Sequence, residues 1–469
     1  MKKALRAIRF SKLDFSYIFS FLGEATLALT FVLYALIGRI VGPERYGIFT
    51  SANALAGILA FFILFGFADL LSREVAADSK KGLQSTSTFL FIETVNCLLV
   101  LLCLWPIARA LGFEGSDILV CYLVVVAIGG RCAKQTLRAA YRGLGQFRQE
   151  TISVTIERSA LFVFSCAALW ITRSLLWVVG IMALIRVADT LYWFFFLKRK
   201  ESLTSPVTSK RIRRSFAMAY PFAISGVLWI LYYQVDILML KALAPTAQQV
   251  GFYGAAYSII EIFSALPRVI FSVSFPRLTK CYAQTPEQLP QKIKQSALLL
   301  IVGVLPFVTA AGFAQTLLIK LTYGADYLPA ISALSLLLPS LIMKMFASLG
   351  SYIFQATRRE KLLPFVLLAT VCLNVAVNAL LIPQFGAIGA AIATLLSEVA
   401  FAVVGLLLIV RVGYRQIGIL LLIVATLGLA IAAVPSMMIY GLSPVAAIAI
   451  MLLSGGAIAL LMRQKVHAV

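Results

Sequence analysis

Apolar residues form long, nearly unbroken runs along this chain, separated by short polar segments. Each run is about 20 residues long, which is enough for a helix to cross about 30 Å of hydrocarbon. The predicted fold is therefore an all-α polytopic membrane protein. We expect fourteen membrane-spanning helices, at 16–40, 48–71, 87–112, 118–139, 152–172, 175–197, 216–240, 251–276, 296–319, 328–354, 362–382, 387–410, 417–440 and 443–462.

Basic residues divide unequally between the two sets of loops that these spans create. If the N-terminus is cytoplasmic, the outer loops contain only Arg45, Arg173, Lys241 and Lys320. The inner loops contain most of the rest, including the segment "KRKESLTSPVTSKRIRRS" between spans six and seven. Cytoplasmic loops carry an excess of Lys and Arg, so this pattern predicts that both termini are cytoplasmic.

The two halves of the chain open in a similar way. Tyr46-Gly47 and Tyr253-Gly254 each lie where an even-numbered span begins from the outer side. Six helices separate the two positions, so the halves run in the same direction, as parallel repeats do. We expect an N-terminal six-helix lobe (1–200), a cytoplasmic linker (201–215), a second six-helix lobe (216–411), and an appended helix pair with tail (412–469).

Composition supports a membrane protein and excludes several other classes. Hydrophobic residues make up 61% and charged residues 13% of the chain, against about a quarter charged in soluble domains. The net charge of +22 comes from basic residues between apolar spans. There they set topology and contact anionic lipid, so we expect membrane lipid as a partner and no nucleic acid. His467 is the only histidine and no cysteines form a CxxC pair, so no metal, cofactor or His-dependent triad is expected.

Ionisable residues occur inside the predicted spans. A charge at the bilayer centre costs about 2.5–3.5 kcal/mol on insertion scales, and such residues normally face protein or water. Their number predicts a hydrated or ion-paired interior between the two halves. These residues are Glu24, Glu93, Arg158, Arg186, Asp189, Asp236, Glu261, Arg268, Lys344 and Glu398.

Arg186 and Asp189 in span six share one helix face because they are three residues apart. Two interpretations are open. The pair could form an internal salt bridge that fixes helix packing. Alternatively, Arg186 could face the substrate while Asp189 limits how tightly that substrate is held.

Span eight contains a polar stripe. Tyr253, Tyr257, Glu261 and Arg268 are separated by 4, 4 and 7 residues and so lie along one helix face. Pro267 removes a backbone donor and predicts a kink. The stripe either lines a central cavity or consists of packing tyrosines with Glu261 in an ion pair.

Polar residues in two further spans have a structural and a functional interpretation. Asp236 in span seven could carry a proton or sodium ion, or could pair with a basic residue of the cavity. Asn374 and Asn378, one turn apart in span eleven, are more typical of hydrogen bonding between neighbouring helices.

Three motifs resemble one protein family. They are "GPERYGIFTSANALAGILAFFILFGFADLLSREVA" (42–76), "LYYQVDILMLKALAPTAQQVGFYGAAYSIIE" (231–261) and "NVAVNALLIPQFGAIGAAIATLLSE" (374–398). In this order they resemble bacterial polysaccharide transporters, the Wzx-type oligosaccharide flippases. That family belongs to the multidrug/oligosaccharidyl-lipid/polysaccharide exporter superfamily.

The resemblance implies a V-shaped bundle of two six-helix lobes. It implies that undecaprenyl-diphosphate-linked oligosaccharide crosses the cytoplasmic (inner) membrane of a bacterium by alternating access, without enzymatic chemistry. Such units build O-antigen, capsule or exopolysaccharide, so a polysaccharide polymerase or other assembly proteins are candidate partners. As in the related lipid II flippases, the last two helices would form a groove for the lipid tail.

An anionic diphosphate head group needs a positively charged cavity, and arginine favours phosphate through paired donors. The candidate substrate-binding residues are Arg158, Arg186, Arg268, Lys344 and Tyr257. No ATP-binding motif is present, so we expect an ion gradient or the membrane potential to drive transport, with H⁺ or Na⁺ as the candidate coupling ion. The candidate ion-coupling or charge-pairing residues are Glu24, Asp189, Asp236, Glu261 and Glu398.

Two alternatives remain at this stage. A multidrug exporter of the same superfamily would have an acidic, aromatic cavity, whereas the basic residues above favour an anionic cargo. A membrane enzyme of a polysaccharide pathway, such as a polymerase, would be expected to have a long external loop, and the predicted outer loops are short.

Overall fold

The computed structural model describes residues 27–200, 207–411, 413–439 and 441–463, and all regular structure in these ranges is helical. Thirteen helices there are long and apolar enough to span a membrane, and the first of them contains two of the predicted spans. The expected all-α polytopic fold is thus confirmed. The count of fourteen crossings and the cytoplasmic termini stay predictions.

The first two predicted spans share one element, α3 (Leu27–Leu64), which is broken at Gly42. Gly42 has φ 81° and ψ 168°, a conformation that L-residues with side chains avoid. Pro43 follows at the start of the second helix, where its missing N–H leaves no helical hydrogen bond unmade. The helix is therefore interrupted at one glycine, in place of the longer loop predicted for 41–47.

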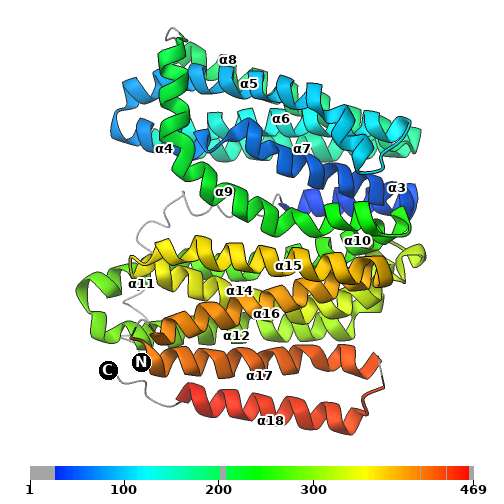
Figure 1. Cartoon of the computed structure of the whole chain (residues 1–469), viewed down its shortest axis with the longest axis vertical. Coiled ribbons are helices and arrows are strands. Elements are labelled where there is room, and N and C mark those ends of the chain that lie inside the picture. Colours follow the sequence, from blue (N-terminus) through cyan, green and yellow to red (C-terminus); the bar gives the residue numbers. More distant parts are fainter. Residues whose placement is uncertain (1–26, 201–206, 412, 440, 464–469) are drawn as a thin grey trace, which may run out of the picture. The chain divides into compact units, whose positions relative to one another are not determined.

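The chain divides into two compact units. The first contains the described residues up to Ile40 together with Leu55–Val227. In this unit α6 contacts α4, α5 and α8, while α7 packs on α8 (Figure 1). Its further helices are α4 (Phe67–Ala77), α5 (Ser79–Ala110), α6 (Ser116–Gly143), α7 (Phe147–Thr172), α8 (Leu175–Lys200) and the first part of α9 (Ser209–Leu243).

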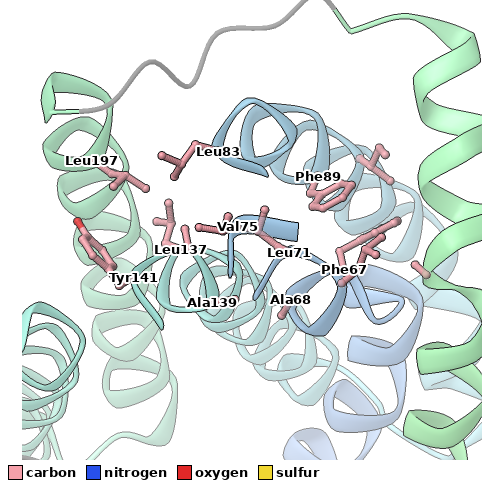
Figure 2. Close-up of a cluster of buried hydrophobic side chains, with 14 of the residues drawn as sticks. Phe67, Ala68, Leu71, Val75, Leu83, Phe89, Leu137, Ala139, Tyr141 and Leu197 are labelled. Atoms are coloured by element: carbon pink, nitrogen blue, oxygen red, sulfur yellow. The ribbon is translucent and has the colours of Figure 1, made fainter. Parts of the chain in front are cut away.

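An apolar core forms where α4 meets α5, α6, α8 and the start of α9 (Figure 2). Phe67 of α4 stacks on Phe89 of α5 with ring centroids 5.2 Å apart. Leu71 and Val75 follow on the same face of α4, at the four-residue spacing that aligns side chains along a helix. This core holds the short helix α4 against the long ones.

The second unit contains Val41–Ala54 and Leu228–Val469. Its most buried helix is α14, which contacts α10, α11, α12, α16 and α17. The helices are α10 (Ala247–Phe263), α11 (Ala265–Gln284), α12 (Leu289–Phe313), α13 (Gln315–Thr322), α14 (Ala330–Ala356), α15 (Leu363–Phe385), α16 (Ala387–Arg411), α17 (Arg415–Ile439) and α18 (Pro444–Arg463). Short 3₁₀ segments are η1 (Pro286–Gln288), η2 (Ala325–Tyr327) and η3 (Glu360–Leu362).

Glycines allow the segment 41–54 to approach α10 closely. A Cβ on Gly251 would lie 2.0 Å from the Pro43 carbonyl oxygen, and one on Gly47 would lie 2.3 Å from that of Ala247. Beside this contact, the buried Tyr46 hydroxyl lies 3.2 Å from the Tyr323 hydroxyl. The Tyr-Gly pair of the first half therefore marks a close helix contact.

The last two helices extend the second unit. α17 packs on α12, α14 and α16, and α18 packs on α17. The outer face of α18 is apolar, with Val445, Leu452 and Leu453 each at least 70% exposed. Lys294 of α12 donates a hydrogen bond to the Leu461 carbonyl near the end of α18, at 3.1 Å. The exposed apolar face is what a pair of helices in contact with lipid would present.

Candidate functional site

A small polar pocket lies inside the second unit, where α9, α10, α14, α15 and α16 meet. Its space is about that of one water molecule. Two carboxylates and one ammonium group line it among tyrosine, hydroxyl and amide side chains. The lining residues are Tyr232, Asp236, Tyr257, Lys344, Val371, Asn374, Thr394, Ser397 and Glu398.

Asp236 of α9 is held by neutral donors from three other helices. Its Oδ2 accepts hydrogen bonds from the Tyr253 hydroxyl at 2.9 Å and the Thr394 hydroxyl at 2.8 Å. Its Oδ1 accepts one from the Asn378 amide at 2.7 Å. Asp236 is 5% exposed. These donors stabilise the carboxylate charge without cancelling it.

Asn374 and Asn378 do form the hydrogen bonds expected of polar groups between helices. The Asn378 amide donates to Asn374 Oδ1 at 2.8 Å as well as to Asp236. Asn378 Oδ1 itself is buried and accepts no hydrogen bond from the described residues. An unused oxygen therefore lies next to the acid.

Glu398 of α16 is the second carboxylate of the pocket and is 3% exposed. One oxygen accepts a hydrogen bond from the Tyr232 hydroxyl. The other, Oε2, is buried without a hydrogen-bond partner in the part of the chain that the structure describes. Buried polar atoms are normally satisfied, so this oxygen is an acceptor that a water molecule or a cation could use.

Lys344 of α14 lies over aromatic rings. Its Nζ is 4.6 Å from the ring centre of Tyr233, 5.6 Å from that of Tyr232 and 5.8 Å from that of Tyr257. Ring faces attract cations at these distances. Within the described ranges, no carboxylate lies within 4.0 Å of this ammonium.

The first unit treats its buried charges differently. Asp189 of α8 forms a buried ion pair with Lys134 of α6. Arg186 Nε lies 4.0 Å from Glu157 Oε1 of α7, and Arg186 is 7% exposed. The internal Arg186–Asp189 salt bridge is therefore not formed, because α8 packs between two helices that each supply an opposite charge.

Lys134 and Glu157 were not predicted as the partners of Asp189 and Arg186. Their positions inside predicted spans marked them as candidates for ion pairs, but the sequence does not show which helices become neighbours. Glu93 of α5 is likewise buried, and its Oε1 accepts a hydrogen bond from the Thr136 hydroxyl at 2.5 Å. Its other oxygen has no partner among the described residues.

The stripe of span eight separates into a buried and an exposed part. Tyr253 and Tyr257 reach the pocket, whereas Glu261 and Arg268 are exposed, and no ion pair between those two is seen in the described chain. The helix breaks at Ser264, between α10 and α11. A kink near this place is expected from Pro267, whose nitrogen cannot donate to the Phe263 carbonyl.

Two of the predicted site residues, Arg158 and Glu24, have not yet been placed. Arg158 is half-buried on α7. Glu24 lies outside the described residues. The structure thus brings Asp236, Glu398, Lys344 and Tyr257 together, and places the first-unit candidates in contacts of their own.

Solved structures share this fold. The lipid II flippase MurJ in an inward closed conformation superposes with a TM-score of 0.70 at 12% identity, covering 94% of this chain and 98% of that one. An inward-facing multidrug resistance MATE transporter of the MOP superfamily gives 0.65 at 16% identity, covering 82% and 97%.

Sequence comparison gives the family. The chain is 23% identical over 395 residues to a probable low-salt glycan biosynthesis flippase, Agl15, of Haloferax volcanii, covering 79% of this chain and 77% of that one. It is 22% identical over 369 residues to a putative O-antigen transporter of Shigella flexneri, covering 76% and 87%. A family profile described as "Polysaccharide biosynthesis protein" matches residues 17–282. The chain therefore belongs to the polysaccharide biosynthesis protein family, as its motifs indicated.

Proposed function

We propose that this protein is a flippase that carries lipid-linked oligosaccharides across the cytoplasmic membrane of a bacterium, for surface polysaccharide assembly. The observation that carries this proposal is the family match over residues 17–282. The names of the curated relatives and the MurJ-like fold support the same conclusion. The chain then acts as a transporter and not as an enzyme, and a polysaccharide polymerase is a candidate partner.

The second-unit pocket is suited to an ion and is too small for the cargo. It has space for about one water molecule, whereas a diphosphate with sugars is many times larger. The same size excludes a drug molecule as its occupant. We infer that Asp236 and Glu398 bind the coupling ion, H⁺ or Na⁺, because buried carboxylates held by neutral donors attract a mobile cation.

Arg268 is the strongest candidate for contact with the diphosphate head group. It is exposed on α11, and no carboxylate of the described residues lies within ion-pair distance. Its planar guanidinium can donate two parallel hydrogen bonds to a phosphate. Arg158 and Arg186 remain proposed members of the same set, although Arg186 is buried beside Glu157.

The tail of the lipid would lie along α17 and α18. Residues 416–462 contain no charged side chain, and the exposed face of α18 is apolar. Such a face keeps a polyprenyl chain in a hydrocarbon environment while the head group crosses. Photocrosslinking with a reactive polyprenyl lipid that labels other helices but never α17 or α18 would contradict this assignment.

The function is tested with the purified chain in liposomes that contain fluorescently labelled undecaprenyl-diphosphate oligosaccharide. We expect externally added quencher to reach label that was initially protected, and Arg268→Ala to slow this by about tenfold, as loss of one charge-assisted phosphate contact would. Arg148→Ala, at an exposed position beside a predicted inner loop, is the matched control. If Arg268→Ala flips the lipid at the wild-type rate, Arg268 does not contact the diphosphate head group. Efflux of a cationic dye without flipping of the lipid would favour the multidrug exporter.

A further inference from the structure

Lys344 is half-buried and occupies an unusual position for a lysine inside a membrane-spanning helix. It shares one pocket with two carboxylates, Asp236 and Glu398, yet pairs with neither. The first unit shows the ordinary behaviour, since Lys134 lies in direct contact with Asp189. Some feature of the pocket must therefore hold the Lys344 ammonium away from the acids.

That feature is a cage of aromatic rings. Tyr232, Tyr233 and Tyr257 present their rings to Nζ at 4.6–5.8 Å, the range in which the negative ring face attracts a cation. Trp229 supports the cage, because it stacks on Tyr233 at 5.9 Å and meets Tyr232 edge-on at 5.6 Å. The ammonium is thus held by uncharged groups.

The acids also accept hydrogen bonds from uncharged groups, although Glu398 Oε2 accepts none from the described residues. Tyr253, Thr394 and Asn378 donate to Asp236, and Tyr232 donates to Glu398. Tyr232 therefore contacts both groups: its ring is part of the cage around Lys344, and its hydroxyl donates to Glu398. Two carboxyl groups and one amino group thus line the same pocket, and the amino group forms no ion pair with either acid.

A lysine side chain can change partners within such a pocket. Its ammonium is a compact point charge on a flexible four-carbon stem. Space for about one water molecule means that a mobile cation and the lysine head cannot both lie against the acids. The other groups that line the pocket are neutral, and the next acid along α10, Glu261, is exposed one turn beyond Tyr257.

We propose that Lys344 is a tethered cation that competes with the coupling ion for Asp236 and Glu398. With the ion bound, Lys344 stays in the tyrosine cage; when the ion leaves, the ammonium moves to the acids and replaces its charge. This keeps the buried pocket from holding two uncompensated negative charges and makes ion release easier. The inference rests on the proposed ion-coupling role of the pocket, and it assigns Lys344 to that role in place of contact with the head group.

The test measures cation binding to the purified full-length chain in lipid nanodiscs. Binding of radioactive sodium is measured at fixed pH. Protonation is followed without sodium by the fluorescence of Trp229, which is the only tryptophan of the second unit. Lys344→Met should tighten sodium binding about tenfold, or move the protonation midpoint up by about one pH unit, because a competing positive charge is removed.

A cage variant should act in the opposite direction. Tyr233→Leu removes the ring closest to Nζ and releases the ammonium toward the acids, so cation binding should weaken. A purely structural role for Lys344 would not produce opposite shifts in the two variants. Lys344→Gln serves if the methionine variant fails to fold. Lys320→Met, which removes an exposed lysine of the same unit, is the control and should leave binding unchanged.

The outcomes separate this inference from the proposed function. If Asp236→Asn retains wild-type sodium binding and protonation, or the wild type shows neither, the ion pocket is wrong and the inference falls with it. If Asp236→Asn abolishes binding but Lys344→Met and Lys344→Gln leave it unchanged, the pocket stands and the competition is wrong. If these Lys344 variants lose affinity for the labelled lipid at unchanged cation binding, Lys344 contacts the head group instead.

Discussion

The ion-paired charges of the first unit and the acids of the second-unit pocket are held in different ways. In the first unit, Asp189 is in contact with Lys134, and Arg186 lies beside Glu157. In the second unit, Asp236 is surrounded by hydroxyl and amide donors while the nearby lysine rests on tyrosine rings. Both arrangements lie inside helices of a membrane protein, where an unpaired charge is expensive.

The comparison distinguishes charges that are used in ion pairs between helices from charges that can still bind a cation. An acid in an ion pair is already neutralised, and it fixes the helix that carries its partner. An acid held only by neutral donors has no opposite charge beside it and can bind a cation that arrives from outside. On this basis we propose that the ion pairs of the first unit are structural and that the acids of the second-unit pocket bind an ion.

Breaking the ion pair of the first unit should have the largest effect on stability. Lys134→Met leaves Asp189 buried without its partner, which is expected to lower the free energy of unfolding by about 3–5 kcal/mol. The melting temperature in detergent measures this. The double variant Lys134→Met/Asp189→Leu removes both charges and should recover most of the loss. A single variant as stable as wild type would show that the pair is not structural.

Removing the donor to Glu398 should have an intermediate effect. Tyr232→Phe leaves this buried carboxylate without its phenol partner, at an expected cost of about 2 kcal/mol. The same melting experiment measures the loss. Tyr192→Phe is a suitable control, since that ring is exposed on α8. Equal stability of both variants would mean that another group satisfies Glu398.

Neutralising Asp236 should have the smallest effect on stability and a clear effect on transport. Asp236→Asn keeps the shape and an acceptor oxygen for the Tyr253 and Thr394 hydroxyls but loses the acceptor for the Asn378 amide, so a change of about 1 kcal/mol is expected. Flipping in liposomes should no longer respond to an imposed H⁺ or Na⁺ gradient. A large loss of stability with gradient-driven flipping intact would reverse the roles assigned to the two units.

Much of the fold follows from local sequence. Each described helix of membrane-spanning length corresponds to an apolar run, because run length and the need to satisfy backbone hydrogen bonds in lipid leave a helix as the one solution. The break near Pro267 and the importance of the Tyr-Gly pair at Tyr46-Gly47 were also visible in the sequence. The break at Gly42 was predicted as a longer loop, because a single glycine in an apolar stretch gives little signal.

The sequence by itself determined the class, the family and the identity of most charged residues inside the spans. Only the tertiary structure decided their partners. Arg186 and Asp189 share a helix face, and yet each meets a different neighbouring helix, because spacing along one helix fixes direction but not which helix packs there. Asp236, Lys344 and Glu398 are up to 162 residues apart in sequence and meet because α9, α14 and α16 enclose one pocket.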